Sequence, residues 1–149
     1  MKSATFLHRR GGACLLCGLA GAGFLALAVS GAAAQEATVS LVRQDFSNCT
    51  NDDVNDGGGR LTSGTLWLVR NPDGTTGVKV AMTVAPDTTY HFFLKCVRQL
   101  GDIKTDDEGI GEALFSFPTS SVGNVFAFDM YPEGAPAGNK FQSVKVQFP

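Results

Sequence analysis

The feature that most constrains this chain is a series of short segments in which hydrophobic and polar residues alternate. From Ala37 onward these segments are separated by turn-forming residues, and no stretch of ten or more residues shows helical periodicity. Successive side chains of a strand point to opposite faces, so a period of two is typical of strands with one buried face. The pattern therefore predicts an all-β fold.

Seven to eight antiparallel strands are expected, and this number at this spacing favours two packed sheets over an open one. We therefore expect a single immunoglobulin-like β-sandwich. The expected strands cover residues 37–43, 64–70, 76–84, 89–97, 100–104, 110–117, 124–131 and 141–148. In strand 89–97, alternation places Tyr90, Phe92, Leu94 and Cys96 toward the core and His91, Phe93 and Lys95 on the other side.

The first 34 residues have the layout of a secretory signal peptide. Lys2, Arg9 and Arg10 precede an apolar stretch over 13–29, and small residues lead up to Ala34. We expect cleavage before Gln35, a mature domain over 35–149 and no stable membrane anchor afterwards. The adjacent arginines leave open a twin-arginine export route, although the residues that follow them depart from that motif.

Removal of that segment leaves two cysteines, Cys49 and Cys96. Two cysteines in an exported chain most simply form one disulfide. The rival interpretation, a metal or redox site, lacks a Cys-x-x-Cys motif and has only His91 as an additional ligand. We expect a disulfide-bonded, secreted or periplasmic protein with no bound metal and no cofactor.

Charge argues against nucleic acid as a partner. Without the three basic residues of the signal, the domain keeps nine basic residues against 14 acidic ones. The nine are scattered singly along the chain, whereas binding to phosphate backbones needs clustered Lys and Arg.

One short segment resembles the tyrosine corner of fibronectin type III domains. In residues 84–90 an apolar residue, Pro, Thr and Tyr recur at alternate positions. The segment lies in mid-domain, whereas the corner of that family lies near its end.

A longer resemblance, to neocarzinostatin-like secreted apoproteins, runs through residues 76–96, 103–109 and 143–148. It rests on an apolar-x-x-x-Thr-x-Tyr strand start, an Asp-x-x-Gly turn and a closing Val-x-Val-x-Phe strand. The resemblance implies a seven-stranded immunoglobulin-like sandwich with a ligand cleft. That family has two short-loop disulfides, which the Cys49 and Cys96 pair does not match, and none of its ligand-contacting residues can be carried onto this sequence.

No catalytic set is recognisable, so we do not expect an enzyme. His91 is the only histidine of the expected mature domain, and no Gly-x-Ser-x-Gly motif accompanies it. Alternation places it on an outward strand face. The densest acidic segment offers hard oxygen donors for calcium in Asn51, Asp52, Asp53, Asn55 and Asp56. Its spacing is not that of an EF-hand, which favours a solvated loop.

Strand residues 66–69 are apolar on both faces and include Trp67, the single tryptophan. The second face is covered by the loop over 45–62, or lies inside the sandwich, or is an exposed patch formed by Trp67, Phe93 and their neighbours.

The leading expectation is an exported non-catalytic protein that binds an unknown protein, a surface or a small apolar ligand at the cell envelope or outside the cell. The alternatives are a small-molecule carrier of the neocarzinostatin type and a secreted inhibitor or hydrolase. An inhibitor would use an exposed loop such as residues 132–139.

Overall fold

The computed structural model describes residues 33–56 and 62–148. The expected signal peptide, residues 1–34, lies outside the described residues except for Ala33 and Ala34. The ten strands of the described residues are β1 (Gln35–Val42), β2 (Thr62–Arg70), β3 (Thr75–Thr83), β4 (Thr89–Leu94), β5 (Arg98–Lys104), β6 (Ile110–Pro118), β7 (Val125–Phe126), β8 (Phe128–Pro132), β9 (Phe141–Ser143) and β10 (Val146–Gln147). A short 3-10 helix, η1 (Thr119–Ser121), follows β6.

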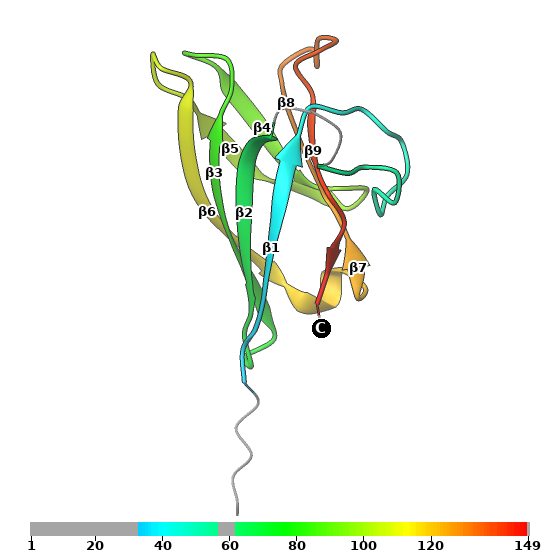
Figure 1. The fold of residues 1–149 in the computed structure, drawn as a ribbon. Coiled ribbons are helices and arrows are strands. Elements are labelled where there is room, and N and C mark those ends of the chain that lie inside the picture. Colours follow the sequence, from blue (N-terminus) through cyan, green and yellow to red (C-terminus); the bar gives the residue numbers. More distant parts are fainter. Residues whose placement is uncertain (1–32, 57–61, 149) are drawn as a thin grey trace, which may run out of the picture. The chain divides into compact units, whose positions relative to one another are not determined.

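Eight of these strands form one antiparallel sheet in the order β5-β4-β8-β9-β1-β2-β3-β6, and β7 pairs with β10. The sheet curls until its two edge strands lie against each other, as Figure 1 shows. At this seam Gly101 of β5 leaves room for the ring of Phe115 of β6, because an added Cβ at Gly101 would stand only 2.6 Å from that ring. The all-β class and the antiparallel strands are confirmed. The expected two-sheet sandwich is corrected to one nearly closed, barrel-like sheet.

The interior of the curled sheet is filled by aromatic and aliphatic side chains. The ring of Phe92 stacks between Phe115 and Phe128, with centroid distances of 5.3 and 5.1 Å. Phe117 and Phe126 meet Phe128 edge to face. Aromatic pairs in these geometries stabilise a core beyond the area that they bury.

Two tight turns have a glycine at the position where the φ angle is positive. Gly74 and Gly109 have φ values of 85° and 82°, a region that favours glycine. At the second turn, Asp106 Oδ1 accepts hydrogen bonds from the backbone N–H groups of Glu108 and Ile110, at 3.0 and 2.7 Å. Asp106 therefore organises the β5–β6 turn.

The hydroxyl of Tyr90 connects two loops. It accepts a hydrogen bond from the backbone N–H of Ala85 at 3.3 Å and donates one to Asn139 Oδ1 at 2.6 Å. Tyr90 thus ties the start of β4 to the preceding loop and to the β8–β9 loop.

The end of strand 89–97 differs from the expectation. Tyr90, Phe92 and Leu94 face the core, but β4 ends at Leu94. Cys96 has a φ of 59° and is exposed, whereas Lys95 is buried. The expected core position of Cys96 was wrong, because the backbone leaves the extended conformation after Leu94.

Cys49 and Cys96 form the expected disulfide, with their Cα atoms 5.6 Å apart. A disulfide of this kind is typical of proteins that fold in an oxidising, extracytoplasmic compartment. Among residues 33–56 and 62–148, no helix has the length and apolar character needed to cross a membrane.

Candidate binding surface

Trp67 lies on the outer face of the sheet, because its neighbours Leu66 and Leu68 point into the core. The strand register places Trp67 in a cross-strand row with Thr38 of β1, Lys79 of β3 and Leu114 of β6. The adjacent row contains Thr65, Ala81 and Glu112, and Thr83 pairs with Ile110 in the row beyond it. We call these outward residues of β2, β3 and β6 the Trp67 face.

The Trp67 face exposes large apolar side chains. Trp67 is 42% exposed, Ile110 46% and Leu114 79%. The described part of the loop over 45–62 contacts β9, Lys95 and Lys145, and Asp56 also accepts a hydrogen bond from Ser40 of β1. Trp67, Ile110 and Leu114 are thus exposed apolar side chains on one face of the sheet.

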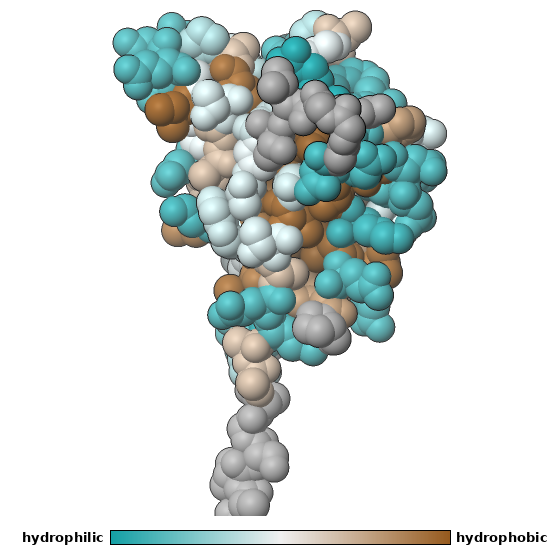
Figure 2. Space-filling model, viewed as in Figure 1, coloured by the Kyte–Doolittle hydropathy of each residue, from teal (hydrophilic) through white to brown (hydrophobic). Residues whose placement is uncertain are grey.

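The polar residues of the Trp67 face lie beside the indole. The Lys79 ammonium lies 5.6 Å from the centre of the Trp67 ring and 3.8 Å from Glu112 Oε2. Figure 2 shows pale residues of near-neutral hydropathy over β2, brown hydrophobic residues beside them, and teal hydrophilic residues farther out over the loops. This side of the sheet is thus neither strongly charged nor wholly apolar.

A pocket of about 330 Å³ opens beside Trp67, which we call the Trp67 pocket. Its lining includes Ser63, Thr65, Trp67, Ala81, Thr83 and Ile110. The hollow arises because Ala81 is small where its neighbours are large. At Gly64, also in the lining, an added Cβ would stand 2.6 Å from the carbonyl oxygen of Ala81, so these strands approach closely there.

Phe93, the other residue expected in the patch, lies elsewhere. It is on β4, four places from β2 in the strand order, so the structure does not bring it together with Trp67. Its ring stacks on Tyr131 of β8 at a centroid distance of 4.8 Å. The expected single patch is therefore two separate surfaces.

His91 adjoins the Phe93 surface and is held between two carboxylates. Its Nδ1 lies 2.7 Å from Asp102 Oδ1, and its Nε2 lies 3.3 Å from Glu133 Oε2 in the β8–β9 loop. Gln99 donates a hydrogen bond to the same Asp102 oxygen at 2.6 Å. The hydrogen bonds to Asp102 and then Glu133 raise the pKa of His91 above its usual value. Both ring nitrogens are thus engaged by carboxylates.

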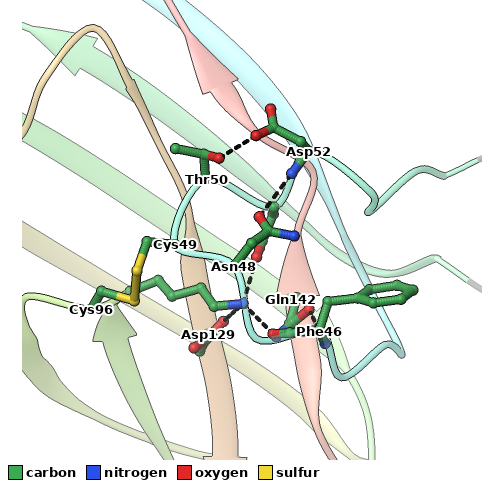
Figure 3. Close-up of a disulfide and its surroundings, with 10 residues drawn as sticks. Phe46, Asn48, Cys49, Thr50, Asp52, Cys96, Asp129 and Gln142 are labelled. Carbon is green, nitrogen blue, oxygen red and sulfur yellow. Dashed lines mark hydrogen bonds and ion pairs between the residues drawn. A yellow bond between two sulfur atoms is a disulfide. The ribbon is translucent and has the colours of Figure 1, made fainter.

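A buried charged network lies under the disulfide, and sequence reasoning missed it. The Lys95 ammonium donates hydrogen bonds to the Phe46 carbonyl oxygen at 2.6 Å and to Asn51 Oδ1 at 2.5 Å, and it lies 3.4 Å from Asp129 Oδ1. Figure 3 shows the Cys49–Cys96 bond beside Phe46, Asp129 and Gln142. Burial raises the pKa of Asp129 to about 6, although the nearby Lys95 charge opposes this shift.

The polar residues of the acidic segment 51–56 each bind a different partner and do not converge on one point. Asn51 donates a hydrogen bond to the Ser143 carbonyl oxygen, Asp52 lies 3.1 Å from the Lys145 ammonium, and Asp56 accepts a hydrogen bond from Ser40. Asp53 accepts one from Asn48. In the part of the chain that the structure describes, no group of three or more acidic, histidine or cysteine residues is arranged to hold a metal ion.

One signal in the sequence could have indicated the buried network. Lys95 lies next to a disulfide cysteine at a strand end, where alternation stops being informative. The Trp67 pocket has no comparable signal, because it depends on which residues the register places beside Ala81.

Comparisons with known proteins identify no family for this sequence. No protein-family model matches the sequence, and no curated protein shows a significant match.

Proposed function

We propose that this chain is an exported, non-catalytic binding protein that uses the Trp67 face to hold a partner at the cell envelope or outside the cell. The observation that carries the proposal is the combination of three exposed apolar side chains with an adjoining pocket on one sheet face. Exposed apolar patches that adjoin a pocket are typical of interaction and ligand sites. The N-terminal signal pattern and the disulfide support export.

The contacts of His91 support a non-catalytic role. Catalysis by a serine or cysteine nucleophile needs a base that is hydrogen-bonded to its hydroxyl or thiol. Both His91 nitrogens instead face carboxylates, which cannot serve as the nucleophile of a serine or cysteine hydrolase. We expect His91→Ala to leave binding unchanged.

Binding on the outer surface is favoured over the carrier alternative. A carrier of the neocarzinostatin type needs an apolar cleft, whereas the core between the strands is filled by packed phenylalanine rings. The Trp67 pocket lies on the outer face of the sheet.

The single tryptophan makes the proposal directly measurable, since intrinsic fluorescence reports on the Trp67 face. Purified protein should be titrated with separate fractions of the producing cells: secreted protein, envelope protein, envelope polysaccharide and lipid. We expect one fraction to shift the Trp67 emission to shorter wavelength, because a partner removes water from the indole. The matched control is Phe93→Ala, which alters the opposite surface and should respond as the wild type does. If no fraction shifts the emission, the proposal is wrong.

A further inference from the structure

We propose that the Trp67 pocket binds a neutral sugar ring, as part of a glycan. This inference rests on the proposed binding function of the same face. It names the chemical class of the ligand.

Charge distinguishes the ligand classes that the Trp67 pocket can take. Among the residues that the structure describes, none that lines this pocket carries a charged side chain. Lys79, a register neighbour of Trp67, already faces Glu112 at 3.8 Å. An anionic or cationic ligand would therefore enter a pocket that offers it no unpaired opposite charge, whereas a neutral ligand needs none.

The lining of the Trp67 pocket also contains polar atoms. Thr65 and Thr83 point outward beside the pocket, and within residues 33–56 and 62–148 neither hydroxyl makes a side-chain hydrogen bond. A wholly apolar ligand would separate these hydroxyls from water without replacing their hydrogen bonds, which is unfavourable. A ligand with its own hydroxyls can both donate to them and accept from them.

The rest of the lining of the Trp67 pocket includes apolar side chains. Trp67 and Ile110 present half-exposed apolar surface on two sides of the small residue Ala81. A flat face of C–H groups fits against an indole ring, whose faces carry negative partial charge. A pyranose ring combines such a face with hydroxyls around its edge. The volume, about 330 Å³, lies at the lower end of the ~300–1,000 Å³ typical of small-ligand pockets.

The test begins with an array of neutral and anionic oligosaccharides probed with labelled wild-type protein, Ala81→Phe and Phe93→Ala. The Ala81→Phe side chain fills the pocket from an outward position, and circular dichroism and thermal unfolding verify that each variant is folded. We expect the wild type and Phe93→Ala to retain the same neutral glycans. Ala81→Phe should bind them at least about tenfold more weakly.

Soluble forms of the retained glycans are then titrated while Trp67 emission is followed. Thr65→Val keeps the shape of the side chain and removes the hydroxyl, so it should weaken glycan binding by about tenfold. The uncharged apolar dye Nile red serves as the comparison ligand. Its binding should not weaken in Thr65→Val.

Each other outcome overturns the sugar assignment. Retention of neutral glycans that Ala81→Phe does not weaken would place the site elsewhere. Binding of only anionic glycans or of only the apolar probe would assign a different ligand class and leave the proposed binding function intact. If no glycan binds, the sugar assignment fails, and the titration with cell fractions decides separately whether the Trp67 face binds a partner.

Discussion

At the scale of single residues, the least expected feature is a lysine that is almost completely buried. Lys95 satisfies its ammonium group with two oxygen acceptors and a carboxylate, which is the arrangement that a buried charge requires. Asp129 has a weaker set of contacts, since its Oδ1 is buried and has no hydrogen bond within the described residues. Asp129 is therefore the member of the pair whose hydrogen bonding is incomplete.

The raised pKa of Asp129 makes the stability of the fold depend on pH in a defined direction. In the unfolded chain the carboxyl has a pKa near 3.8, against about 6 in the native state. Between these values the native state binds the proton more tightly, so the stabilisation is complete below about pH 4 and is lost as the pH rises through 6. The free energy of unfolding should fall by at most about 3 kcal/mol from this group.

The measurement is denaturant unfolding of the wild type and of Asp129→Asn at intervals from pH 4 to pH 7. We expect a shallower decline in the variant, because asparagine does not titrate. Equal slopes in the two proteins would show that Asp129 titrates normally.

A second prediction concerns His91, whose pKa the two carboxylates raise. Nuclear magnetic resonance titration of the imidazole should give a pKa above 6.5. Asp102→Asn should lower this pKa more than Glu133→Gln does, because the hydrogen bond to Asp102 is the largest cause. The stabilising contribution of this contact is present below pH 6.5 and is lost as the pH rises through the native pKa. An unchanged pKa in Asp102→Asn would contradict the account.

At the scale of elements, the β5–β6 turn is fitted closely to the loop before β4. A Cβ at Gly109 would stand 2.2 Å from the carbonyl oxygen of Val84, and the φ of this residue is positive. We expect Gly109→Ala to reduce the free energy of unfolding by about 1–3 kcal/mol or more, from backbone strain and the steric clash.

The matched control for the turn is Gly123→Ala, since an added Cβ there has no heavy atom within 4 Å among the described residues. This variant should stay within about 0.5 kcal/mol of the wild type. Denaturant unfolding measures both proteins. Equal stabilities for the two variants would show that the β5–β6 turn is not packed as described.

The strands were predictable from sequence because alternation is a local property. The inward set of β4 up to Leu94 followed from it. The order of the strands did not, since pairing joins residues far apart in the chain. Alternation indicates one buried face equally well for a sandwich and for a nearly closed sheet.

The candidate site was half predictable for the same reason. Alternation placed Phe93 outward and left three arrangements open for Trp67, and only the strand order shows that the two lie on separate surfaces. The pocket depends on small residues, Gly64 and Ala81, which carry no signal of their own in the sequence.

At the scale of the whole molecule, the disulfide fastens the loop after β1 onto the segment after β4. The two cysteines are 47 residues apart, and closing a loop of that length should stabilise the fold by about 4 kcal/mol in the chain-entropy model. The double variant Cys49→Ser/Cys96→Ser should lose about this amount of stability in denaturant unfolding. It should keep the native Trp67 emission, because β2 is held by its pairing with β1 and β3, which the disulfide does not join. A loss below about 1 kcal/mol would show that the Lys95 network holds the loop without the disulfide.

The central claim is that this domain binds a partner through the Trp67 face. The most direct measurement is co-sedimentation of the wild type, Ala81→Phe and Phe93→Ala with isolated envelopes and precipitated extracellular polymers of the producing cells. The account predicts that the wild type and Phe93→Ala are found in the pellet while folded Ala81→Phe remains in the supernatant. Equal sedimentation of all three proteins, or sedimentation of none, would contradict it.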